Sequence, residues 1–257
     1  MGHGRGMQLT GPDALAHALW FGAGLLVVTG LTAGLLRASG AGLGFFPLWV
    51  VVRASVQLAV VALLLRGILA VPATVAAFVA LMLTTASWTA GRRLREVWHG
   101  RVAATVGVLA GALVALVVVF GLRLVDLQVR YLVATAGIII GNAMSAATLS
   151  GRNFLRGTRH RRDEVEGWLA LGATPSRANE AVGQEAVRES LLPNLDQTKS
   201  TGLVTLPGAF VGALFGGASP AQAAQFQLVV LAGIALASLV TGVTVTRLVG
   251  RSPYVIG

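Results

Sequence analysis

A long polar stretch, Gly151–Ser200, interrupts an otherwise nearly continuous series of hydrophobic segments. The hydrophobic sequence resumes at Thr201 and continues almost to Gly257. A helix needs about 20 consecutive apolar residues to cross a bilayer, and several segments on both sides of the break are that long. The sequence therefore predicts a set of membrane helices that carries one large polar loop.

The composition also indicates a membrane protein. Hydrophobic residues make up 55% of the 257 residues and charged residues only 12%, whereas soluble domains carry about 25% charged residues. The 33 glycines suit membrane helices, because small residues let helices approach closely. Because the chain has no cysteine, disulfides, thiolate metal ligands and cysteine nucleophiles are excluded.

The hydrophobic segments predict an all-α fold, a polytopic membrane helical bundle of about seven transmembrane helices. We expect residues 1–257 to form a single transmembrane domain with a cytoplasmic loop at 151–200. The sixth segment is short and glycine-rich, and a broken or re-entrant helix is the alternative there. The expected spans are Leu15–Leu36, Gly44–Leu65, Ile68–Ala90, Val102–Leu122, Tyr131–Leu149, Thr201–Gly217 and Gln225–Thr246.

The placement of basic residues predicts the orientation of these spans. Lys and Arg are enriched in the cytoplasmic loops of membrane proteins. If the loop 151–200 is cytoplasmic, 15 of the 20 basic residues lie inside; Arg53 lies in a span, and Arg5, Arg66, Arg123 and Arg130 lie outside. This predicts an outside N-terminus, a cytoplasmic C-terminus and an external turn at Gly217–Ala224. The net charge of +10 is thus explained by membrane topology, without a nucleic acid.

The polar loop contains two predicted amphipathic helices. Three acidic residues crowd the start of the first, where they oppose the helix dipole favourably, and Gly172 ends it. Thr174 and Pro175 then begin a second helix, which we expect to stop at Pro193. The first helix carries acids at Asp163, Glu164 and Glu166, and an apolar stripe of Val165, Trp168, Leu169 and Leu171.

We interpret the first loop helix as the attachment site for a soluble protein. The alternative is a helix that lies on the lipid surface, but such helices have a basic polar face, whereas acids and bases alternate here. The predicted contact residues are Glu164, Glu166, Leu169, Leu171, Gly172, Ala173, Thr174 and Pro175.

Five motifs occur in an order that resembles the FetB/YbbM-type permease family of ABC transporters, and the resemblance extends from about Arg53 to Thr246. They are R-A-S-V-Q-L at Arg53–Leu58, G-N-A-M-S-A at Gly141–Ala146, L-A-L-G-A-T-P at Leu169–Pro175, T-G-L-V-T-L-P-G at Thr201–Gly208 and G-G-A-S-P at Gly216–Pro220. The resemblance implies a bacterial inner-membrane permease that pairs with a separate ATPase and exports a metal such as iron. We expect it to work as a homodimer with two such ATPase subunits.

The cargo is less constrained by this resemblance than the machinery. Plant relatives in the family are linked to aluminium tolerance and to nucleotide-sugar transport. Family members carry methionines and a glutamine in the sixth span, and this chain has neither over Gly208–Gly216. That departure weighs against a metal cargo, and an anionic organic or nucleotide-sugar substrate is the alternative.

The chain has no nucleotide site of its own. A P-loop needs the pattern G-x-x-x-x-G-K-[ST], and the single lysine, Lys199, precedes a serine but lacks those glycines. We expect no cofactor on this chain, with ATP and Mg²⁺ on the partner subunit, and no catalytic residue. A metal site remains unknown from the sequence.

Two other function classes fit less well. An ion-coupled secondary transporter places ionisable groups at membrane depth, and no acidic residue falls within the expected spans. An intramembrane enzyme would need grouped catalytic or metal-binding residues. The four histidines, His3, His17, His99 and His160, are scattered and lack the spacing of metal ligands.

A small set of polar residues within the spans is the candidate translocation path. Arg53 lies in the second span with Gln57 one turn away, and either a structural hydrogen bond or a polar cavity would explain them. An arginine repels a bare cation, so this residue favours an anionic cargo or complex. Asn142 and Ser145 in the fifth span either contact cargo or bond a neighbouring helix.

Glycine spacing predicts close helix packing at two places. Gly137 and Gly141 form one G-x-x-x-G pair, and Gly208, Gly212 and Gly216 form a series in the sixth span. Such spacing lets helix backbones approach, either within the bundle or between two copies of the chain.

Overall fold

The computed structural model describes residues 12–40, 42, 45–68 and 72–253. The expected outside N-terminus and the predicted boundary residues 44 and 69–71 lie outside this part. The chain divides into two compact units, Met1–Ala70 and Val71–Gly257. The regular structure of the described residues is helical, and six of these helices are long and apolar enough to cross a membrane. The protein is therefore a polytopic helical membrane protein.

Unit 1 contains two long helices that contact each other, α1 at Pro12–Ala38 and α2 at Phe46–Ile68. Most of their large apolar side chains are exposed, including Trp20 and Trp49. The guanidinium carbon of Arg37, in the last turn of α1, lies 5.7 Å from the ring centre of Phe45. Apolar helices exposed over nearly their whole surface are suited to a lipid environment rather than to water.

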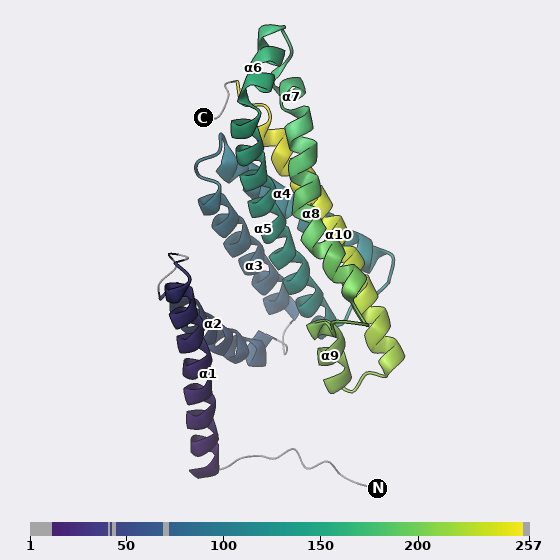
Figure 1. The fold of residues 1–257 in the computed structure, drawn as a ribbon. Coiled ribbons are helices and arrows are strands. Elements are labelled where there is room, and N and C mark those ends of the chain that lie inside the picture. Colours follow the sequence, from purple (N-terminus) through teal and green to yellow (C-terminus); the bar gives the residue numbers. More distant parts are fainter. Residues whose placement is uncertain (1–11, 41, 43–44, 69–71, 254–257) are drawn as a thin grey trace. The chain divides into compact units, whose positions relative to one another are not determined.

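Unit 2 is a bundle of five long helices with three short ones at its two ends (Figure 1). The long helices are α3 at Pro72–Arg93, α4 at Gly100–Gly121, α5 at Val129–His160, α8 at Glu180–Ser200 and α10 at Pro220–Val249. Helices α6 (Arg162–Ala170) and α7 (Pro175–Ala178) lie together at one end, which we call the tip end. Helix α9 (Gly208–Phe215) lies at the opposite end, which we call the α9 end.

Helices α4 and α10 form the centre of unit 2 and pack closely through glycine. A Cβ added to Gly111 of α4 would overlap the hydroxyl of Thr241 and lie 2.5 Å from the carbonyl oxygen of Ala237. One turn away, the Thr241 hydroxyl donates to the carbonyl of Gly107 across 3.1 Å. This G-x-x-x-G pair in α4 brings two backbones together, as small residues do in membrane helices.

Six of the seven expected spans are confirmed as helices of membrane-spanning length, α1 to α5 and α10. The sixth, Thr201–Gly217, is wrong as a continuous span. The chain turns at Gly202, which has a φ of +91°, and residues 201–207 form an irregular segment before the short helix α9. The broken-helix alternative for this segment therefore describes it correctly.

The polar stretch Gly151–Ser200 also differs from the expected loop. Helix α5 continues past Leu149 to His160, and α8 continues through Pro193 to Ser200. A proline removes one backbone hydrogen bond from a helix interior. Packing along α5 and α10 outweighs that loss, because tertiary contacts supply most of a helix's stability in a protein.

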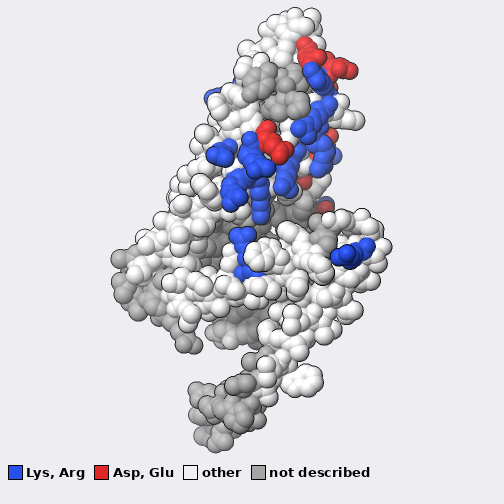
Figure 2. All heavy atoms as spheres, turned by 90° about the vertical axis from the view of Figure 1, so that its left-hand side faces the viewer, with Lys and Arg blue, Asp and Glu red and all other residues white. Residues whose placement is uncertain are grey.

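Basic side chains gather toward the tip end. Figure 2 shows most of them in one band on this face, with acidic side chains among them and farther out toward the tip. Helix α3 ends there at Arg92 and Arg93, α4 begins there beside Arg101, and α10 ends there after Arg247. A band of arginine next to apolar helices marks one membrane boundary.

Candidate functional site

The tip is a helix–turn–helix joined at Gly172. The amides of Gly172 and Ala173 donate to the carbonyls of Leu169 and Trp168, each across 3.0 Å, and close the end of α6. Gly172 has a φ of +87°, the left-handed conformation that favours glycine. Thr174 is then extended, and Pro175 starts α7. The predicted glycine stop and proline start are both confirmed.

The apolar stripe of α6 divides between the protein's own core and its surface. Val165 is buried, and Leu169 packs against the hydrophobic core of unit 2. Trp168 and Leu171 are exposed, and the side chain of Leu171 is 83% accessible. These two exposed apolar residues on a polar tip are the ones available for contact with another protein.

Ion pairs hold the charged side chains of the tip. Arg162 and Glu166 pair across 2.7 Å within α6, Arg161 pairs with Glu185 of α8, and Arg177 pairs with Glu180. The hydrogen bond and the charge of Glu166 raise the pKa of Arg162 above its ordinary value. Glu166, a predicted contact residue, thus has an ion-pair partner within its own helix, and both Glu166 and Glu164 are exposed.

Helix α8 runs from the tip into the depth of the apolar bundle. The Asn194 amide donates to the Ser238 hydroxyl of α10 across 3.1 Å. The neighbouring residue of α10, Ala237, faces Gly111 in the middle of α4. Asn194 therefore lies level with the middle of two helices long and apolar enough to span a membrane.

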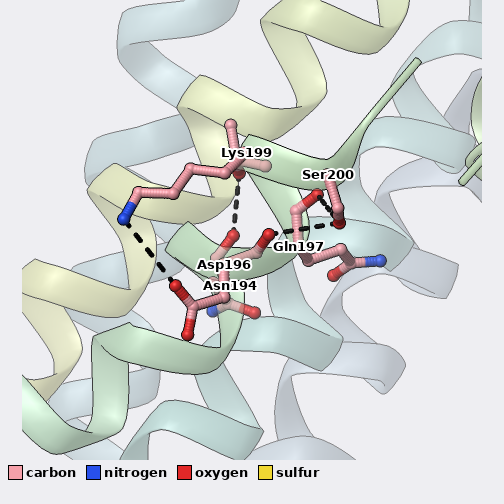
Figure 3. Close-up of polar contacts among 6 residues, drawn as sticks. Asn194, Asp196, Gln197, Lys199 and Ser200 are labelled. Carbon is pink, nitrogen blue, oxygen red and sulfur yellow. Dashed lines mark hydrogen bonds and ion pairs between the residues drawn. The ribbon is translucent and has the colours of Figure 1, made fainter. Parts of the chain in front are cut away.

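The last two turns of α8 are polar and charged (Figure 3). The Lys199 ammonium lies 3.9 Å from an Asp196 carboxylate oxygen, and both side chains are largely exposed. The hydroxyl of Ser200 donates to the carbonyls of Asp196 and Gln197. With a rise of about 1.5 Å per residue, Asp196 lies roughly 3 Å and Lys199 roughly 7.5 Å beyond Asn194. If a bilayer is centred on the middle of α4 and α10, both lie within its apolar core, which extends about 15 Å from its middle.

Asp196 is then a carboxylate level with the apolar middle of α4 and α10. Insertion scales assign about 2.5–3.5 kcal/mol to each central Asp or Lys side chain that faces lipid. The attraction between the two charges offsets the cost of removing both from water only where the geometry is close and further hydrogen bonds are made, and this pair is 3.9 Å apart. Asp196 lies outside every expected span, as the sequence indicates, but its helix packs along α5 and α10, and lipid alone would not solvate its charge along this face.

Two of the predicted path residues, Arg53 and Gln57, lie in unit 1. They are one turn apart on α2, and both are exposed within that unit. Their role in a translocation path stays a prediction.

The other two predicted path residues lie on α5 and bond their own helix. The Asn142 amide donates to the carbonyl of Ile138 across 2.9 Å, and the Ser145 hydroxyl donates to that of Gly141 across 3.0 Å. The described contacts thus satisfy these donors within α5. The predicted choice between cargo contact and bonding to a second helix stays untested.

The predicted packing glycines meet different surroundings. A Cβ on Gly137 would lie 3.0 Å from Met82 of α3, so Gly137 lies at a helix contact. Gly141, Gly208 and Gly212 have open space within the described residues, and Gly216 lies just beyond α9. The series Gly208, Gly212 and Gly216 lies along α9 and its C-cap, and its role in helix packing stays a prediction.

A polar cavity of about 720 Å³ opens at the α9 end. It lies between the start of α5, helix α9 and the start of α10. Its lining contains both basic and acidic side chains. The Nε of Arg130 donates to the Gln128 side chain across 3.0 Å, and its guanidinium lies 5.1 Å from the ring centre of Tyr131. The lining residues include Arg123, Asp126, Arg130, Tyr131 and Gln222. This cavity gives unit 2 a polar opening at the end opposite the tip.

Comparison with known proteins places the chain among membrane proteins of bacteria and plants. It is 36% identical over 205 residues to the UPF0014 membrane protein STAR2 of Oryza sativa subsp. japonica, covering 78% of this chain and 71% of the rice protein. It is 30% identical over 185 residues to the probable iron export permease protein FetB of Escherichia coli, covering 71% of each chain. It is 31% identical over 255 residues to the UPF0014 membrane protein slr1647 of Synechocystis, covering 93% of this chain and 97% of that protein.

No solved structure matches the chain. The model of an uncharacterised protein family, UPF0014, matches residues 19–254, which include both units, the tip and the broken segment at 201–207. The chain belongs to the UPF0014 family of multi-pass membrane proteins.

Proposed function

We propose that this chain is the membrane permease subunit of an ATP-driven ABC transporter, and that it exports a metal such as iron. The name of the Escherichia coli relative supports the permease role and the metal cargo, over a match that covers 71% of both chains. The working unit is a homodimer of the permease with two ATPase subunits in the inner membrane. ATP and Mg²⁺ bind those partner subunits, which supply the chemistry of hydrolysis.

The observation that carries this proposal is the connection of the tip to two long helices. Helix α6 follows α5 after a break at Arg161, and α7 leads into α8 at Asn179. The ion pair of Arg161 with Glu185 ties the two long helices together just below the tip. A movement of the tip is therefore transmitted to α5 and α8 together, because both are rigid and joined at that point.

The tip offers the ATPase a small apolar contact with charges around it. Trp168 of α6 and Leu171, the residue that follows α6, are exposed apolar residues, and Gly172 fixes the turn that presents them. Contacts between proteins draw most of their energy from a few such buried anchors. Closure of the ATPase subunits on ATP would displace the tip, and α5 and α8 would tilt with it.

The orientation we propose places the tip in the cytoplasm. The arginine band lies at the tip end, and basic residues favour the cytoplasmic side. The C-terminal end of α10 then faces the cytoplasm, and the polar cavity and the turn between α9 and α10 face outward; the expected external turn Gly217–Ala224 shortens to Gly217–Ser219, because α10 begins at Pro220. This orientation gives the ATPase access to Leu171.

A second cargo class has one observation in its favour. Arg53 is an exposed, permanently charged residue on the apolar helix α2, and a guanidinium attracts anions and repels bare cations. An anionic organic compound, such as a nucleotide sugar, or an anionic metal complex would suit it. The experiment below therefore compares cargo classes instead of assuming iron.

The test is ATP hydrolysis by the partner ATPase reconstituted with the chain in lipid vesicles. We expect the permease to bind the ATPase and a transported compound to stimulate hydrolysis. Ferrous and ferric iron, aluminium and a nucleotide sugar are added separately, with the ATPase alone as the control. Failure of the ATPase to bind the intact chain contradicts the permease role, whereas binding with stimulation by the nucleotide sugar alone contradicts only the metal cargo.

A further inference from the structure

The outward face of α8 carries one stripe that is exposed within unit 2 and lies level with the apolar middle of α4 and α10. Leu192, Leu195, Asp196 and Lys199 are spaced three, four and seven residues apart, so they share one face of the helix. All four are exposed. The opposite face is occupied: Ser190 and Val187 lie within contact distance of Gly242, and Asn194 bonds Ser238.

We propose that this stripe is the surface through which two copies of the chain meet in the membrane, with Asp196 of each copy paired with Lys199 of the other. The inference rests on the proposed homodimer, but on neither the ATPase nor the cargo. It assigns a partner to two charges that lipid cannot solvate.

The charges of the stripe are self-complementary. One carboxylate and one ammonium lie one turn apart, so the stripe has no net charge at membrane depth. A two-fold axis brings the same patch of both copies together. A contact between Asp196 of one copy and Lys199 of the other therefore occurs twice. The result is a closed ring of four alternating charges, in which each charge has a partner on both chains.

The geometry of α8 permits that ring. A two-fold axis along the membrane normal keeps both copies the same way up, so their α8 helices run in parallel. Lys199 lies roughly 4.5 Å farther along the helix than Asp196. The flexible four-carbon stem of lysine spans such an offset. Leu192 and Leu195, toward the tip, supply apolar contact beside the charges.

Transported cargo is the other partner that this polar stripe could contact. The Asp196 and Lys199 side chains lie 3.9 Å apart, and each already lowers the attraction of the other for a small ion of either sign. A neutral, paired stripe matches an equally neutral, paired surface better than it matches a metal ion. We therefore assign the stripe to a second copy and make cargo an outcome of the test.

The experiment uses two full-length chains with different tags, expressed separately and together. One carries Asp196→Lys and presents two ammonium groups, and the other carries Lys199→Asp and presents two carboxylates. Each variant alone should give at least about tenfold less dimer than the parent, because like charges meet across the axis. Co-expression should restore the mixed dimer to near the parent level, since every charge again meets its opposite.

The pair Arg177 and Glu180 provides a matched control. It has the same three-residue spacing and exposed side chains, but it lies at the tip. Arg177→Glu and Glu180→Arg should leave the dimer unchanged, both alone and together. A purely intrachain role for Asp196 and Lys199 predicts no rescue on co-expression, because neither variant regains its own pair.

A charge reversal could prevent insertion, so a second experiment tests the interface by cysteine crosslinking in a chain that keeps both charges. The chain contains no cysteine, so Leu195→Cys should crosslink only to its counterpart in a second copy. Val117→Cys, on the exposed face of α4, is the control and should not crosslink. Crosslinking at Leu195 together with rescue of the mixed dimer supports the inference.

Two results would overturn it. One is the absence of a Leu195→Cys crosslink in membranes that contain the dimer. The other is a set of single charge reversals that leave the dimer intact but abolish stimulation by cargo, which would assign the stripe to the transport path. A dimer that forms as predicted but binds no ATPase would instead contradict the proposed permease role and leave this inference standing.

Discussion

Asn194 of α8 donates a hydrogen bond to Ser238 of α10 across 3.1 Å, and this contact sets the depth of α8 in the bundle. Ser238 is fully buried in a helix of membrane-spanning length. The polar second half of α8 thus runs back from the tip along the apolar helix α10. It leads into the irregular segment 201–207 and helix α9, where a continuous sixth span was expected.

The first prediction concerns this depth. Ser176→Cys on α7 should react with a membrane-impermeant maleimide from the cytoplasmic side only. Leu195→Cys should not react from either side of intact membranes, but should react after solubilisation and unfolding. If α8 were part of a soluble loop, Leu195→Cys would be labelled from the cytoplasm as readily as Ser176→Cys.

The second prediction concerns the contact between α4 and α10. Gly111→Ala should destabilise unit 2 by at least about 1–3 kcal/mol, because the new methyl group overlaps Thr241 and the Ala237 carbonyl. Thermal unfolding of the purified chain in detergent measures the effect. Gly121→Ala, at the open end of the same helix, is the control and should change stability by less than about 0.5 kcal/mol. Equal effects of the two substitutions would show that the contact is not as close as described.

The third prediction concerns Gly172, where the backbone conformation, and not the available space, should make a substitution costly. Gly172→Ala should cost about 1–2 kcal/mol locally, because alanine is strained at a φ of +87° although the site has room for a methyl group. The turn should loosen, and binding of the ATPase should weaken while insertion stays normal. Gly167→Ala, in the open on α6, should instead stabilise the helix by up to about 1 kcal/mol. ATPase affinity for the two variants tests the difference, and a weaker affinity for Gly167→Ala than for Gly172→Ala would refute it.

The fourth prediction concerns Arg53. Arg53→Leu should insert at least as well as the parent, because the cost of placing a guanidinium in a membrane helix, about 2.5–3.5 kcal/mol on insertion scales, disappears. If Arg53 contributes to the path, stimulation of ATP hydrolysis by cargo should be lost. A structural arginine gives the reverse result, namely poor expression with normal stimulation in the protein that folds. Expression level and stimulated hydrolysis are measured on the same preparation.

Helix positions were predicted well where apolar length alone decides the structure. Six of the seven spans follow from runs of about 20 apolar residues. The turn at the tip also followed from sequence, because Gly172 and Pro175 have strong conformational preferences. In these places one local property outweighs any tertiary effect.

The path of α8 was not predicted because its stabilisation is tertiary. The sequence of α8 is typical of a surface helix, and Pro193 indicates a helix end. Packing on α5 and α10 nevertheless stabilises the helix as far as Ser200. The spacing of Leu192, Leu195, Asp196 and Lys199 was the available signal for an outward face that continues past the proline. Likewise, Gly107 and Gly111 have the spacing seen at Gly137 and Gly141, and only the structure shows which pair makes the closer contact.

The sequence also did not predict which apolar residues at the tip are buried and which are exposed. Four apolar residues shared one amphipathic pattern, but Leu169 packs inward and Leu171 faces outward. Leu169→Asp should therefore destabilise the tip, whereas Leu171→Asp should leave the thermal unfolding temperature unchanged. This difference separates loss of the tip from loss of a contact.

The most direct test of the permease role is the effect of Leu171→Asp on the partner ATPase in vesicles. Leu171→Asp should insert and dimerise like the parent, yet retain at least about tenfold less ATPase, because a charge replaces an apolar anchor at the contact. Stimulation of ATP hydrolysis by cargo should be lost with it. Full retention of the ATPase and unchanged stimulation in Leu171→Asp would contradict coupling through this tip.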